Sequence, residues 1–386
     1  MGGSSVGVLW GLVKLFAAVV LVGALVPVPA DAAAGSFFRT VKGVRATPAG
    51  LVMTGARSGF SFWTRTLGEG REPLAYRWDG RAWRSSKLPS GLAGVNLELV
   101  EDASGPANVW AATSVGLSDA SSGVVEGSSS QVIRWDGRAW RRARVFDRTR
   151  IEGLLTRGRS DVWAWGREHD ASGRPAAYVS WHYDGRSWAR RVGRKGPSGG
   201  AFRARGGLWS VVSGAVPKLR QWQGGRWRSR TIPLPKGTRG TALTAGGSGA
   251  GNKIVVGLTS ERTVKGHPAI STYVLIWDGR RWRTEKPKQA QGRSIHGFIP
   301  DGSGGIWAMA YVTSWYGPDF HLHLLHRSAK GVWRQRTVGQ KEGWVTSWAL
   351  VPGTKRVVGL LEMTEGCCEG LIAVSRKKDP ARAFPG

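Results

Sequence analysis

Residues 134–140 read Arg-Trp-Asp-Gly-Arg-Ala-Trp, and residues 77–83 repeat the same seven residue types in the same order. Variants of this stretch stand at 183–188, 222–227, 277–282 and 326–333, the last of them degenerate. Asp-Gly between two apolar runs is the strongest short-range signal for a β-hairpin, because Gly accepts a positive φ in a tight turn. The sequence therefore predicts a repeated hairpin, with aromatic residues beside most of the turns.

A short apolar triplet precedes each hairpin and predicts a second kind of strand. It stands at 51–53, 109–111, 162–164, 208–210, 254–256, 306–308 and 357–359. Turn residues bound these runs and no useful helical period crosses them, so they are interpreted as strands. One whole unit then holds four strands, at about 151–157, 162–167, 177–183 and 187–192 in the third unit. Four antiparallel strands repeated about every 50 residues are typical of a propeller blade.

The number of blades follows from counting each strand separately. The second and third strands each occur seven times, whereas the outer strand after the turn occurs six times. Residues 36–41 resemble the outer strand at 332–338, so we expect the N-terminal segment to supply the missing strand. The predicted fold is an all-β, seven-bladed β-propeller of four-stranded antiparallel blades, closed by the N-terminal strand. Six or eight blades are the alternatives.

The first 34 residues have the features of a secretory signal peptide. Lys14 precedes an apolar run over 15–28, and a small-residue site allows cleavage after Ala32 or Ala34. We therefore expect a signal peptide at 1–34, a single propeller domain at 35–378, a C-terminal tail at 379–386 and an extracellular location.

The pairing of a Val-Trp-Ala strand with a Trp-Asp-Gly-x-x-Trp hairpin, as at 109–111 and 135–140, resembles the Trp-rich repeats of secreted actinobacterial β-propellers. It is also similar to kelch-type and tectonin-type propellers. The resemblance covers nearly the whole predicted domain. It implies a fold and brings no catalytic residues with it.

The formal charge of the chain is +30. Such a charge attracts polyanions, among them nucleic acid, acidic polysaccharide and anionic envelope polymers. The excess is nearly all Arg and is spread along the sequence, and a clustered patch would be stronger support for such a partner. The chain has two cysteines, the neighbours Cys367 and Cys368, for which we expect a disulfide because secretion favours oxidised cysteine. A pair of free thiols is the alternative.

The candidate ligand-binding residues fall on loops of the face opposite the Asp-Gly turns. These loops are expected at 57–73, 116–129, 168–175, 261–269, 314–320 and 365–370. Aromatic rings near polar groups suit sugar binding, and Trp63, Trp315 and Trp344 exceed what the repeat requires. The predicted ligand-binding residues are Trp63, Arg65, His169, His267, Trp315, Tyr316, Asp319, Trp344, Glu365 and Glu369. Packing of the same rings under the loops is the alternative.

Metal, cofactor and catalytic signals are weak. His321, His323 and His326 lie on one expected strand, but the sequence provides no third ligand beside the first two, so neither a metal site nor a cofactor is predicted. No signature of a hydrolase nucleophile or a phosphate-binding loop is present. We expect a secreted, non-enzymatic, monomeric propeller that binds glycans or anionic cell-envelope polymers, without a membrane span or specific nucleic-acid partner. The alternatives are a polysaccharide hydrolase or lyase, and a scaffold for protein partners.

Overall fold

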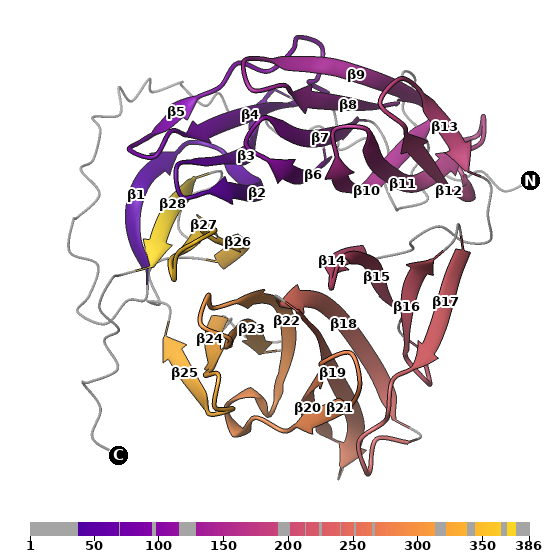
Figure 1. Ribbon diagram of the computed structural model, residues 1–386, viewed down its shortest axis with the longest axis vertical. Helices are drawn as coiled ribbons and strands as arrows, with labels where there is room; N and C mark the ends of the chain where they lie inside the picture. The colour runs from indigo at the N-terminus through magenta and orange to yellow at the C-terminus, as the bar shows by residue number, and fades with distance from the viewer. Residues whose placement is uncertain are drawn as a thin grey trace, which may run out of the picture.

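The computed structural model consists of seven four-stranded antiparallel sheets arranged in a ring (Figure 1). It describes residues 38–68, 70–94, 98–115, 129–191, 201–212, 214–223, 226–239, 241–250, 252–264, 267–312, 322–337, 344–363 and 369–375. The predicted blade number and strand order are confirmed. The expected signal peptide and tail lie outside the described residues, and no helix long and apolar enough to cross a bilayer occurs within these ranges.

The strands of each blade run in chain order from the centre to the rim. Blade 1 holds β2 (Thr47–Gly55), β3 (Ser58–Leu67), β4 (Gly70–Trp78) and β5 (Trp83–Ser85). Blade 2 holds β6 (Glu98–Gly105), β7 (Asn108–Val115), β8 (Ser129–Trp135) and β9 (Trp140–Asp147). Blade 3 holds β10 (Thr149–Gly158), β11 (Asp161–His169), β12 (Pro175–Tyr183) and β13 (Trp188–Arg191). Blade 4 holds β14 (Ala201–Ala204), β15 (Gly207–Val212), β16 (Lys218–Gln223) and β17 (Arg226–Thr231).

The remaining blades follow the same order. Blade 5 holds β18 (Ala242–Ala250), β19 (Lys253–Val264), β20 (His267–Trp277) and β21 (Trp282–Glu285). A 3-10 turn, η1 (Lys288–Ala290), leads into blade 6, which holds β22 (Arg293–Pro300), β23 (Ile306–Val312), β24 (Leu322–Arg327) and β25 (Trp333–Thr337). Blade 7 holds β26 (Trp344–Leu350), β27 (Val357–Glu362) and β28 (Gly370–Ser375), and β1 (Phe38–Val44) adds its outer strand.

The Asp-Gly turns are built as the sequence predicts. In blade 2, Gly137 has a φ of 104°, and Asp136 Oδ1 accepts hydrogen bonds from the backbone N–H groups of Arg138 and Ala139 at 2.9 Å. A Cβ atom added to Gly137 would lie 3.0 Å from that of Ala107, which belongs to the turn between the first two strands of the same blade. These two turns therefore share one face of the ring, and glycine allows their close approach.

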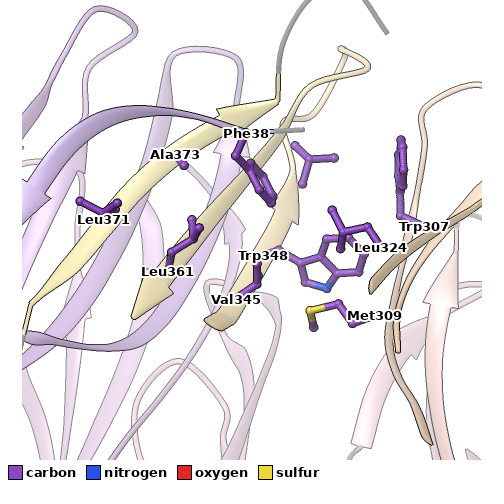
Figure 2. Close-up of a cluster of buried hydrophobic side chains, with 10 residues drawn as sticks. Phe38, Trp307, Met309, Leu324, Val345, Trp348, Leu361, Leu371 and Ala373 are labelled. Carbon is purple, nitrogen blue, oxygen red and sulfur yellow. The ribbon is translucent and has the colours of Figure 1, made fainter. Parts of the chain in front are cut away.

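The N-terminal strand closes the ring, as the strand count predicts. β1 pairs antiparallel with β28, from Phe38 opposite Ser375 to Val44 opposite Gly370. Figure 2 shows Phe38 among buried side chains of blades 6 and 7, including Leu361, Leu371 and Trp348. The closure removes the free sheet edge that blade 7 would otherwise present.

The second strand of blade 1 corrects one assignment made from sequence. Residues 51–53 belong to β2, the innermost strand, and β3 occupies the second position instead. Gly59 pairs with Trp78 as Val109 pairs with Trp135, so Phe60 stands where other blades carry Trp. The error has a simple cause: a buried inner strand is as apolar as a buried second strand, and the short triplet cannot distinguish them.

Candidate ligand-binding sites

Trp63 and Arg65 lie on strand β3 and not on a long open loop. The predicted loop at 57–73 is a hairpin of β3 and β4, and Trp63 has 0 % exposure. Its indole Nε1 donates to Ser61 Oγ at 3.0 Å, and its ring lies against Gly370 of blade 7. Trp63 is therefore a packing residue between blades, which corrects its expected exposure. Arg65 is exposed and forms an ion pair with Glu72 on the neighbouring strand.

His169 and Glu369 occupy different environments on the predicted face. His169 ends β11 and is 6 % exposed, and its burial lowers its pKa and favours the neutral ring. Glu369 is exposed just before β28, and its backbone carbonyl accepts a hydrogen bond from the backbone N–H of Met363 at 3.0 Å. His267 and Trp344 begin β20 and β26, and their side chains lie outside the described part. Trp315, Tyr316, Asp319, Glu365, Cys367 and Cys368 also lie outside it.

The strand histidines of blade 6 have local partners. His326 Nε2 lies 2.9 Å from Asp301 Oδ2, and its ring stacks on Trp307 with centroids 4.2 Å apart. His323 Nδ1 lies 2.7 Å from the Gln335 amide nitrogen. His321 lies outside the described residues. Among the residues that are described, no group of three or more His, Cys, Asp or Glu side chains is placed to hold a metal ion.

A pocket of about 680 Å³, lined by both polar and apolar side chains, opens where the inner strands of blades 1, 2 and 3 begin. Arg150 of blade 3 binds Glu98 of blade 2 in a two-pronged contact of 2.6 and 2.8 Å. Arg167 lies 2.9 Å from Glu152, and its guanidinium is 4.7 Å from the centre of the Tyr178 ring. Paired charges and an exposed ring provide donors, acceptors and an apolar face for a hydroxyl-rich ligand.

Farther along β6, two neighbouring carboxyl groups connect this inner strand with those of blades 1 and 3. Glu101 Oε1 accepts a hydrogen bond from the backbone N–H of Leu51 in blade 1 at 2.9 Å. Its carboxyl group occupies the space left by the missing side chain of Gly50, where a Cβ would lie 2.1 Å from Glu101 Oε2. Asp102 turns to blade 3 and accepts from the Thr156 backbone, and Arg203 of blade 4 lies 3.3 Å away. Burial raises the pKa of both carboxyl groups, that of Glu101 to about 7.

Replacing Glu101 with Gln should flatten the dependence of stability on pH. A carboxyl group whose pKa rises on folding contributes fully below its unfolded value of 4.5, and this contribution is lost as pH rises through about 7. Glu101→Gln keeps an acceptor oxygen for Leu51 and cannot ionise, so its free energy of unfolding should rise by about 2.5 kcal/mol relative to that of the wild type between pH 5 and pH 8. Urea unfolding at both pH values measures this gain. Equal pH dependence in Glu101→Gln and in the exposed control Glu261→Gln would contradict the prediction.

The balance of basic and acidic residues differs between the centre and the rim of the ring. The described outer strands carry 14 Lys or Arg residues and two acidic ones, whereas the inner strands carry four of each sign. The outer basic residues are Arg39, Lys42, Arg84, Arg141, Arg142, Arg144, Arg190, Arg191, Arg226, Arg228, Arg230, Arg283, Arg334 and Arg336, and the acidic ones are Asp147 and Glu285. Figure 1 places these strands at the periphery. We call these fourteen side chains the basic rim.

Sequence reasoning missed the basic rim although its signal was present. An arginine stands one or two residues after the Trp that follows each turn, and in β17 arginines alternate as Arg226, Arg228 and Arg230 around Trp227. Residues two apart in a strand point to the same side. The excess is spread in sequence because each blade adds a few charges, and aligning the repeats would have grouped them.

The comparisons with known proteins support the fold alone. No protein-family model matches the chain, and no curated protein matches its sequence. An acylaminoacyl peptidase from Pyrococcus horikoshii is 10 % identical with a TM-score of 0.51, and the match covers 82 % of this chain and 49 % of the peptidase. A PL25 ulvan lyase is 11 % identical with a TM-score of 0.45, and the match covers 89 % of this chain and all of the lyase. The Aleuria aurantia lectin is 14 % identical with a TM-score of 0.39, covering 77 % and 98 %. The sheet topology and the sequence define the chain as a Trp-rich, seven-bladed β-propeller.

Proposed function

We propose that this protein binds anionic polymers through the basic rim. The observation that carries the proposal is the fourteen-to-two excess of basic over acidic residues on the outer strands, against an even balance on the inner strands. A field of one sign attracts a polyanion and releases its counterions on binding. The expected signal peptide at 1–34 supports a place for this function outside the cell, where acidic glycans and envelope polymers occur.

Binding to polygalacturonate should be strong at low salt and weaken steeply as salt is added. If about three carboxylates are neutralised, the affinity should fall at least tenfold between 50 and 200 mM NaCl. Titration calorimetry at several salt concentrations measures this slope, with neutral dextran as the control polymer. No binding of polygalacturonate at 50 mM NaCl, or binding that salt leaves unchanged, would refute the proposal.

A second candidate function is recognition of a neutral sugar by the pocket at the start of the inner strands. Its charges are paired, Glu98 with Arg150 and Glu152 with Arg167, and the Tyr178 ring is 40 % exposed. Dextran binding that does not depend on salt would favour this function. Because both carboxylates are held by guanidinium groups, the pocket favours binding over acid–base catalysis by a hydrolase or lyase.

A further inference from the structure

Two grooves on the outer part of the ring have the same construction. The first, of about 630 Å³, lies between blades 1 and 2, and the second, of about 440 Å³, lies between blades 2 and 3. Each is lined by the end of the third strand and the outer strand of one blade, and by the Asp-Gly hairpin of the next. The repeat therefore builds one kind of groove twice, and we call them groove 1/2 and groove 2/3.

Each groove contains two arginines directly opposite each other on neighbouring strands. Arg77 pairs with Arg84 in groove 1/2, and Arg134 pairs with Arg141 in groove 2/3. Like charges at opposite positions destabilise a sheet. Asp79 and Asp136 each contact one arginine of the pair, at 2.6 and 2.8 Å. One carboxylate for two guanidinium groups leaves a positive excess in each groove.

Among the described blades, only blades 1 and 2 carry two arginines at this pair of positions. The same strand position holds His182 opposite Ala189 in blade 3 and Gln221 opposite Arg228 in blade 4. Blades 5, 6 and 7 combine one arginine with Ile276, His326 and Val374, respectively. Two further exposed cations line each groove at equivalent positions: Lys87 and Arg138 in groove 1/2, and Arg144 and Arg186 in groove 2/3. Groove 2/3 is also lined by the exposed Arg142.

Aromatic and apolar side chains also line both grooves, beside several serines. Trp135 and Trp140, opposite each other in blade 2, line groove 1/2 with only 5 % and 6 % of their surfaces exposed, and the half-buried Leu88 and Pro89 adjoin them. Tyr183 and Trp188 occupy the equivalent places in groove 2/3. The Arg77 guanidinium lies 5.0 Å from the centre of the Trp135 ring, so cationic and apolar surfaces adjoin. An acidic sugar unites an anionic group with an apolar ring face, whereas polyphosphate has only the charge.

We propose that grooves 1/2 and 2/3 are two copies of one subsite for acidic sugar residues, so that a single acidic polysaccharide occupies both. The inference rests on the proposed function and names its ligand class and its sites. Occupation of two sites by one chain raises the affinity beyond that of either site, because the second contact becomes intramolecular. The rest of the basic rim attracts the polymer without selecting it.

Three double variants of equal charge test the grooves. Lys87→Gln/Arg138→Gln changes groove 1/2, Arg144→Gln/Arg186→Gln changes groove 2/3, and Arg228→Gln/Arg334→Gln removes two exposed rim charges elsewhere. All six side chains are exposed, so each variant should unfold at the wild-type temperature. We expect either groove variant to weaken polygalacturonate binding about tenfold at 100 mM NaCl and the rim control less than threefold. Polyphosphate of matched charge should distinguish the three variants little.

The outcomes separate the two proposals. If the wild type does not bind polygalacturonate at 50 mM NaCl, the proposed function fails. If it binds polygalacturonate and all three variants lose affinity equally, the basic rim acts diffusely and the groove subsites are wrong. If the groove variants weaken polyphosphate as much as polygalacturonate, the sites select charge alone and the assignment to acidic sugars is overturned.

Discussion

Phe38→Ala should lower the free energy of unfolding by about 3–5 kcal/mol, the range for truncating a buried Phe. The Phe38 side chain is 1 % exposed, and its ring lies so close to Gly359 of β27 that a Cβ there would be 2.9 Å away. The cavity left by the substitution would be bounded by backbone and by packed side chains of blades 6 and 7 (Figure 2). Chemical unfolding followed by Trp fluorescence measures the loss.

A matched control lies three residues along the same strand. Val41 is 42 % exposed, so Val41→Ala should change the free energy of unfolding by less than about 0.5 kcal/mol. Deleting residues 33–42, which removes most of β1, should destabilise the protein far more than removing the tail after Lys378. Equal losses for Phe38→Ala and Val41→Ala would show that β1 does not hold the ring closed.

The repeat made most of the fold predictable from sequence. The Asp-Gly hairpin specifies its own turn, because Asp136 accepts two backbone hydrogen bonds and Gly137 takes the positive φ. Strand counting then located the closing strand at the other end of the chain. Blade 1 was misread at its second strand because Phe60 replaces the Trp that marks this position in four other blades.

The sites were less predictable because they depend on neighbours in space. Trp63 is surplus to the repeat in sequence, yet it is buried against Gly370, about 300 residues away in the chain. The basic rim forms only when the outer strands of all seven blades gather at the periphery of the ring. The grooves need the strand register as well, since it is the pairing of Arg77 with Arg84 that concentrates their charge.

Arg327→Met should cost about 3–5 kcal/mol, the range for breaking a buried ion pair by removing one partner. The Arg327 side chain of blade 6 is 3 % exposed and binds Glu285 of blade 5 through Nε at 2.7 Å and Nη2 at 2.6 Å. Without Arg327, Glu285 keeps the Trp333 indole N–H at 2.8 Å and loses its countercharge. The exposed pair of Arg65 and Glu72 provides the control, and Arg65→Met should cost less than about 1 kcal/mol.

The pH dependence of the free energy of unfolding should show whether the unpaired charge of Glu285 causes the loss in Arg327→Met. Burial opposes ionisation of Glu285, but hydrogen bonds from Arg327 and Trp333 outweigh it and hold its pKa below 4.5. A carboxyl group whose pKa falls on folding adds stability above its unfolded value, and this is lost as pH falls through the folded pKa. The cost of Arg327→Met should therefore be largest near pH 7 and shrink below about pH 4.5. Adding Glu285→Leu should restore much of the stability, because it removes the unpaired carboxylate. A cost that stays constant with pH and persists in the double variant would instead indicate lost packing of the arginine stem.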